Sequence, residues 1–172
     1  MKSIKKTVLC ILLVVLLLSL SACYHTPKKI RDLTLPELSD NEMTIVIKNG
    51  KADYTIYTVD LSVFDESLGY IFGSMVLEYL RDERGLALDW VSSPDGFLII
   101  GIGSLTADMS NGEIILEYTN NTDYHYAALW GRKERIYDVG DVRLKLSASR
   151  VSNMRIAPGD VIYFELDKFD KK

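Results

Sequence analysis

Cysteine and histidine are scarce in this chain, with two of each among 172 residues. Cys10 lies inside an N-terminal apolar run and Cys23 follows it, so residues 24–172 contain no cysteine. That lack excludes a disulfide, a thiolate metal site and a cysteine nucleophile from this part of the chain. His25 and His125 are far apart in sequence and do not form a metal-binding pattern. We therefore expect no metal and no other cofactor.

Catalytic and nucleotide-binding motifs are also missing. The tetrapeptide at 101–104, Gly-Ile-Gly-Ser, matches neither a Gly-x-Ser-x-Gly nucleophile elbow nor a dinucleotide-binding turn with its third glycine. Asp108, Asn111 and Glu113 bring oxygens together, but without the alternating spacing of a calcium loop, so a turn is favoured. Because a base, nucleophile or metal should leave some trace, we expect a protein that is not an enzyme.

No apolar run is long enough to favour a permanent membrane span. The longest, Val8–Leu18, has eleven residues, whereas a spanning helix needs about 20. Three lysines precede this run and small residues follow it, which is the pattern of a secretory signal. The segment ends in Leu20-Ser21-Ala22-Cys23, which resembles the lipobox of bacterial lipoproteins. The resemblance implies cleavage after Ala22 and a diacylglyceryl anchor on Cys23. Ordinary signal-peptidase cleavage, with Cys23 incidental, is the alternative.

The remaining 150 residues are the size of a single domain. Removal of residues 1–22, with three lysines and no acid, changes the net charge from −4 to −7. An acidic domain is a poor partner for a phosphate backbone, so we expect no nucleic acid. We predict a domain over residues 43–167 and a charged tail over 168–172.

Residues 23–42 are typical of a tether. Two prolines interrupt them and no apolar period persists. Lys28, Lys29 and Arg31 are placed either to rest on anionic lipid headgroups or simply to be solvated. We expect the protein to work outside the cytoplasm, with its domain lifted off the membrane by this tether.

The domain opens with a predicted hairpin followed by one helix. Residues 43–48 and 54–59 alternate in the manner of strands, and Asn49-Gly50 is the preferred pair for a type I′ turn. The periodicity of apolar residues then predicts a helix over about 65–84, with Asp65 as N-cap and Gly85 at its end. The expected buried side chains of the helix are Leu68, Phe72, Val76 and Leu80.

Beyond the helix the pattern is of strands and turns. Strands are expected over 86–91, 97–100, 113–119, 124–130, 136–137, 142–146 and 161–166, with a long loop over 101–112. One helix on a mostly antiparallel sheet makes the fold class α+β.

The order of these motifs also resembles a known family. The sequence contains, in this order, a hairpin, a helix ending in Arg-Asp-Glu-Arg-Gly85, Trp90, Glu117-Tyr-Thr-Asn120 and Gly159-Asp-Val-Ile-Tyr-Phe164. This arrangement is similar to a bacterial domain-of-unknown-function family related to the C-terminal β-domain of transcobalamin. The resemblance covers about residues 44–166. It implies a β-grasp-like sheet on secreted or lipid-anchored proteins, and transcobalamin relatives bind corrinoids between this domain and a helical domain.

Aromatic and amide side chains gather between residues 118 and 130. Rings of this kind supply contact area at low entropic cost and often form recognition surfaces. Since alternate residues of a strand face the core, a place in the core is the favoured interpretation for part of the set. The candidate ligand-binding residues are Tyr118, Asn121, Tyr124, Tyr126 and Trp130.

These sequence features support two candidate functions. The first is a lipid-anchored binding module outside the cytoplasm that captures a small ligand, corrinoid-like by the family resemblance, for uptake. The second is a module that binds an envelope protein or the cell wall. A ligand module requires a concave pocket, whereas an interaction module requires an exposed patch or an open sheet edge.

Overall fold

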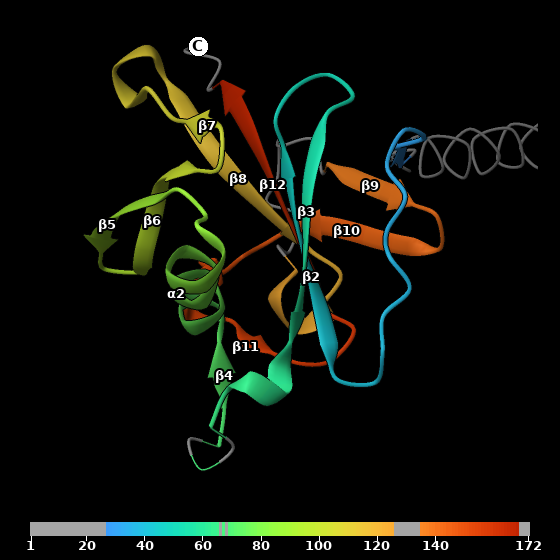
Figure 1. Cartoon of the computed structure of the whole chain (residues 1–172). Coiled ribbons are helices and arrows are strands. Elements are labelled where there is room, and N and C mark those ends of the chain that lie inside the picture. The colour runs from blue at the N-terminus through green and yellow to red at the C-terminus, as the bar shows by residue number, and fades with distance from the viewer. Residues whose placement is uncertain (1–26, 66, 68, 126–134, 169–172) are drawn as a thin grey trace, which may run out of the picture.

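The computed structural model describes residues 27–65, 67, 69–125 and 135–168. Within these residues lie a seven-stranded sheet, a three-stranded sheet, a two-stranded ribbon and the α-helix α2 (Gly73–Arg84). Figure 1 shows α2 and the small sheet on one side of the strands of the large sheet. The predicted α+β class is confirmed. No helix among the described residues is long and apolar enough to cross a bilayer.

The large sheet has the strand order β1-β9-β10-β8-β12-β2-β3. The pairs β1–β9 and β12–β2 are parallel, and the other neighbours are antiparallel. The C-terminal strand therefore lies beside the first strand of the hairpin. The strands are β1 (Lys28–Lys29), β2 (Glu42–Lys48), β3 (Tyr54–Asp60), β8 (Glu113–Thr119), β9 (Ile136–Val139), β10 (Val142–Leu146) and β12 (Val161–Lys168).

The hairpin β2–β3 is confirmed, but its turn is not of type I′. A five-residue loop over 49–53 connects the strands, because Lys48 pairs with Tyr54. Neither Asn49 nor Gly50 has the positive φ that the predicted turn requires. Asn49 instead closes the loop through its backbone N–H, which donates to the carbonyl of Asp53 over 2.9 Å. Its side chain donates to Thr55 Oγ1, which explains the asparagine without a tight turn.

The helix is shorter than predicted and begins eight residues later, at Gly73 rather than Asp65. The carboxylate of Asp65 caps a local turn by accepting from Ser67 N–H. Residues Ile71–Phe72 form the short strand β4, which pairs with β11 (Arg155–Ile156). Because Ile71 and Phe72 pair with β11, they do not join the helix. The spacing of apolar residues along the chain does not reveal this pairing. The predicted C-terminus is confirmed, with Gly85 left-handed at φ 68°.

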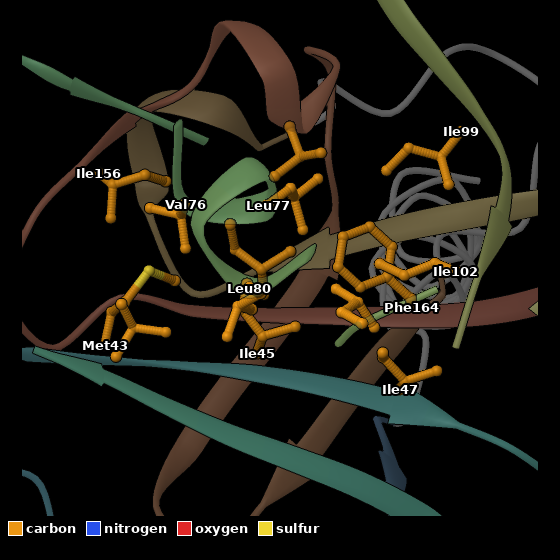
Figure 2. Packing of buried hydrophobic residues seen from close by; sticks show 14 of the residues in the cluster. Met43, Ile45, Ile47, Val76, Leu77, Leu80, Ile99, Ile102, Ile156 and Phe164 are labelled. Carbon is orange, nitrogen blue, oxygen red and sulfur yellow. The ribbon is translucent and has the colours of Figure 1, made fainter. Parts of the chain in front are cut away.

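The core lies between α2, the large sheet and the small sheet (Figure 2). Val76 and Leu80 are buried, as predicted, and Leu77 joins them. Phe72 is 37% exposed, so its predicted burial is wrong, and Leu68 lies outside the described residues. The facing side chains are Met43, Ile45, Ile47, Ile99, Ile102 and Phe164.

A second apolar cluster covers the other face of the large sheet. It contains Val46, Tyr118, Tyr137 and Tyr163 from the strands. Leu33, from the segment expected to be a tether, is buried in it. The segment therefore follows the domain from β1 onward, rather than extending away from it.

The small sheet is formed by β5 (Leu88–Ser93), β6 (Gly96–Ile102) and β7 (Leu105–Thr106). Pro94 and Asp95 form the turn that connects β5 to β6. The expected long loop at 101–112 instead contains the end of β6, all of β7 and the 3₁₀ turn η3 (Met109–Asn111). The expected strand over 97–100 lies within β6, but only Ile99 of it is fully buried.

Candidate functional site

The structure separates the described members of the predicted ligand-binding set. Tyr118 lies in the second cluster, whereas Tyr124 packs against the first, on the other face of the sheet. Asn121 lies in the loop between them. Tyr126, Trp130 and the proposed lipidation residue Cys23 lie outside the described residues. Tyr118, Asn121 and Tyr124 do not form one continuous surface.

Asn121 braces a loop. Its Nδ2 donates to Asp160 Oδ2 over 3.2 Å, and its Oδ1 accepts from Asp123 N–H over 3.2 Å. Asp160 also accepts from Ala157 N–H, and burial raises the pKa of its carboxyl. These bonds connect the segment after β8 to the turn before β12. The side-chain amide of Asn121 thus makes these hydrogen bonds within the protein.

Tyr124 lies next to an exposed aromatic surface near β4 and β11. It ends the 3₁₀ turn η4 (Thr122–Tyr124), so the expected strand does not begin there. Its hydroxyl accepts from Arg155 N–H over 2.9 Å. The guanidinium carbon of Arg155 lies 3.9 Å from the ring centroid of Tyr70, which is 53% exposed. Tyr70 and the half-exposed Phe72 have ring centroids 6.5 Å apart.

Tyr118 belongs to a buried polar network centred on Glu165. The carboxylate of Glu165 is 4% exposed and accepts from Tyr118 over 2.8 Å and from Tyr137 over 2.7 Å. Lys48 Nζ donates to the other oxygen over 3.1 Å. Burial raises the pKa of both Tyr118 and Tyr137, and the nearby carboxylate acts in the same direction. The phenols therefore remain protonated donors.

Sequence reasoning missed Glu165 and Lys48. The available signal was the alternation of β12, which places Tyr163 and Glu165 on one face of a strand that is buried over most of its length. A carboxylate within such a strand needs donors, because an unpaired buried charge is costly. The network satisfies Glu165 internally and is well explained as structural.

A second buried carboxylate, Glu117, lies on the helix side of the sheet. Its Oε2 accepts from Val151 N–H over 2.6 Å, and Arg150 Nη1 is 4.0 Å from its Oε1. Burial raises the pKa of Glu117 to about 7, although the hydrogen bond and Arg150 oppose the change. Glu117 thus fixes the 3₁₀ turn η5 (Val151–Asn153), against which α2 begins.

A hollow of about 610 Å³ lies between the N-terminal segment and the β9–β10 hairpin. Apolar and charged side chains both line it, with a basic pair from the N-terminal segment and an acidic pair from the hairpin. The apolar residues are Ile30, Leu33, Leu35, Val139 and Val142, and the charged ones are Lys29, Arg31, Asp138 and Asp141. A concave apolar site with a few polar groups is the usual form of a small-molecule site. None of its residues was in the predicted ligand-binding set, because their proximity depends on β1 pairing with β9.

The described residues do not gather into a metal-ligand cluster. None of them forms a group of three or more histidine, cysteine, aspartate or glutamate side chains placed to hold a metal ion. Glu165 and Glu117 lie on opposite faces of the sheet, on β12 and β8, so they do not form a carboxylate pair.

No family model and no curated protein matches this chain. Among solved structures, one similar chain is described as a putative metal binding protein from Ruminococcus gnavus. It shares 15% identity and a TM-score of 0.44, over 75% of this chain and 98% of that one.

Proposed function

We propose that this protein is a lipid-anchored binding module outside the cytoplasm, with Cys23 as the anchored residue, and that it captures a small ligand. The observation that carries the proposal is the hollow beside the N-terminal segment. Its volume of about 610 Å³ lies within the range of about 300–1,000 Å³ common for ligand pockets. The export signal and the lipobox-like tetrapeptide support the location.

The lining of the hollow suggests an amphiphilic ligand. The partly exposed Ile30 and Val142 favour an apolar body, while Lys29 and Arg31 favour a carboxylate or phosphate group. The family resemblance makes a corrinoid the first ligand to test. A β-grasp-like description is supported by the parallel pairing of β2 with β12 and by the packing of α2 on the same sheet.

A spectral titration tests this proposal. Cobalamin added to the purified protein should give a saturable change of its visible absorption. Thr34→Trp should fill the hollow and weaken binding at least tenfold, because Thr34 is an exposed lining residue. The matched control Thr122→Trp, at an exposed position in η4, should leave affinity unchanged.

The titration also separates the hollow from the aromatic segment at 118–130. If Tyr124→Ala with Tyr126→Ala abolishes binding in a folded protein while Thr34→Trp does not, the ligand binds at the segment. A panel of amphiphilic carboxylates and phosphates, followed by thermal shift, extends the test beyond corrinoids. The proposal fails if neither cobalamin nor any panel member binds.

The second candidate is a module that binds the cell wall or an envelope protein. The exposed surface formed by Tyr70, Phe72 and Arg155 favours it, since aromatic and arginine side chains dominate recognition surfaces. Cosedimentation with isolated cell walls tests this function. Tyr70→Ala should reduce binding and Tyr57→Ala, on β3, should not.

A further inference from the structure

The N-terminal segment is fixed to the domain almost as soon as it leaves Cys23. Lys28 pairs with Tyr137 and Lys29 with Asp138, in a parallel bridge between β1 and β9. The next residue, Ile30, donates its N–H to the carbonyl of Asp138 over 3.0 Å. Lys28 is the fifth residue after Cys23, and an extended chain spans at most about 3.6 Å per residue. An anchor at Cys23 therefore holds this edge within roughly 18 Å of the lipid.

Basic side chains gather at that edge. Lys28, Lys29 and Arg31 are exposed, although the predicted mature domain has a net charge of −7. The acidic neighbours are Asp32, Asp138 and Asp141, and Asp138 is already paired with Arg143 over 2.8 Å. Lys28 also lies over the Tyr137 ring at 6.0 Å. With Arg143 counted, four basic groups therefore lie beside three acidic ones where the chain approaches its anchor.

We propose that the edge formed by residues 28–31 and the β9–β10 turn docks on the anionic headgroups of the membrane. The inference rests on the proposed anchor at Cys23. Each basic residue near an anionic surface contributes about fivefold to the bound population. The docked domain places the hollow, whose wall includes Lys29 and Arg31, at the headgroup layer. An amphiphilic ligand would then be exchanged at the lipid–water boundary.

Single-cysteine labelling of the lipid-modified protein in vesicles tests the docking. Residues 24–172 contain no cysteine, so Thr34→Cys and Ser92→Cys each provide one thiol at an exposed position. Position 34 lines the hollow, whereas position 92 is in β5, on the opposite side of the molecule in Figure 1. A fluorophore at position 34 should be quenched by spin-labelled headgroups in vesicles containing phosphatidylglycerol, and a fluorophore at position 92 should not.

Charge variants show whether the basic edge causes the docking. Lys29→Glu with Arg31→Glu should reduce the ratio of docked to free domain by about 25-fold or more. Lys51→Glu with Arg84→Glu makes the same change in net charge at exposed positions elsewhere and should leave quenching unchanged. Vesicles of phosphatidylcholine alone, or about 1 M salt with its screening length of about 3 Å, should abolish the quenching.

The two proposals fail in different ways. The unsubstituted protein has only Cys23 available once residues 1–22 are removed, so labelling by maleimide and a mass without lipid would overturn the anchor. A lipid-modified protein with equal quenching at positions 34 and 92 would overturn the docking alone. Equal effects of the two charge-reversal pairs would also overturn it, because a non-specific repulsion would then explain the loss.

Discussion

The hydroxyl of Tyr137 donates to Glu165 Oε1 over 2.7 Å, beneath a sheet face where the carboxylate is almost fully buried. Tyr118 donates to the same oxygen, and Lys48 approaches the other. The buried carboxylate and its three donors stabilise one another, and removing one member leaves a buried polar group without a partner.

Truncating the acid should therefore cost more than removing one donor. Glu165→Ala should lower the free energy of unfolding by about 3–5 kcal/mol, because Lys48 and the phenols lose their acceptor. Tyr137→Phe should cost about 1.5–3 kcal/mol, the usual value for a hydrogen bond to a charged group. Urea denaturation measures both. The exposed control Glu83→Ala should stay within about 0.5 kcal/mol of the unsubstituted protein. A smaller loss for Glu165→Ala than for Tyr137→Phe would contradict this account.

The raised pKa of Glu117 predicts that the free energy of unfolding falls as the pH rises. Burial raises the pKa of its carboxyl from 4.5 to about 7, so the folded protein holds a proton that the unfolded chain releases. The contribution of protonated Glu117 to the free energy of unfolding is fully present below about pH 4.5 and is lost as the pH rises through about 7. A difference of about 2.5 pKa units corresponds to about 3 kcal/mol. Denaturation at a series of pH values from 5 to 8.5 measures the slope.

The matched variant for this prediction is Glu117→Gln. Its amide oxygen can still accept from Val151 N–H, but the group no longer titrates. The variant should lose most of the pH dependence between 5 and 8.5 and should be more stable than the unsubstituted protein at pH 8.5. Asp138→Asn is the control, because its partly exposed carboxylate has a pKa lowered by Arg143 and titrates below this window. An unchanged slope in Glu117→Gln would rule out Glu117 as its origin.

Local periodicity predicted the hairpin, the strand at 113–119 and the C-terminal end of the helix, because each depends on neighbouring residues. The start of the helix could not be found this way, since Ile71 pairs with Ile156, which is distant in sequence. The buried network was missed for the same reason: Lys48 and Glu165 meet only through the β2–β12 pairing. The hollow requires Lys29 to lie beside Asp138, which again no local pattern specifies.

Gly73 is required by a close approach of two elements. A Cβ built at this position would lie 2.1 Å from the carbonyl oxygen of Val151, which belongs to the backbone. Gly73→Ala should therefore destabilise the protein by about 1–3 kcal/mol or more, although alanine favours a helix. Ser74→Ala, at the next position of α2, should change stability by less than about 0.5 kcal/mol. Thermal unfolding compares the two. A stabilised Gly73→Ala variant would show that η5 moves away without cost.

The proposed anchor makes a prediction about processing. Cys23→Ser removes the thiol that would carry the diacylglyceryl group, so the protein should be released from membranes or remain unprocessed. Membrane fractionation and intact mass measure the result. Ser21→Ala is the control, since a small residue remains at that position and the lipid-modified product should persist. Identical fractionation and mass for Cys23→Ser and the unsubstituted protein would contradict the lipoprotein assignment.

The contrast between Leu80 and Phe72 tests the observed helix boundaries. Leu80 is fully buried against the large sheet, whereas Phe72 is 37% exposed and lies just before the helix. Leu80→Ala should cost about 2–5 kcal/mol, because it removes buried methyl groups and leaves a cavity. Phe72→Ala should cost clearly less than the 3–5 kcal/mol typical of a buried phenylalanine. Urea denaturation of both variants at one pH gives the comparison. If Phe72→Ala is the more damaging change, the helix begins before Gly73 and buries Phe72, as its periodicity alone suggests.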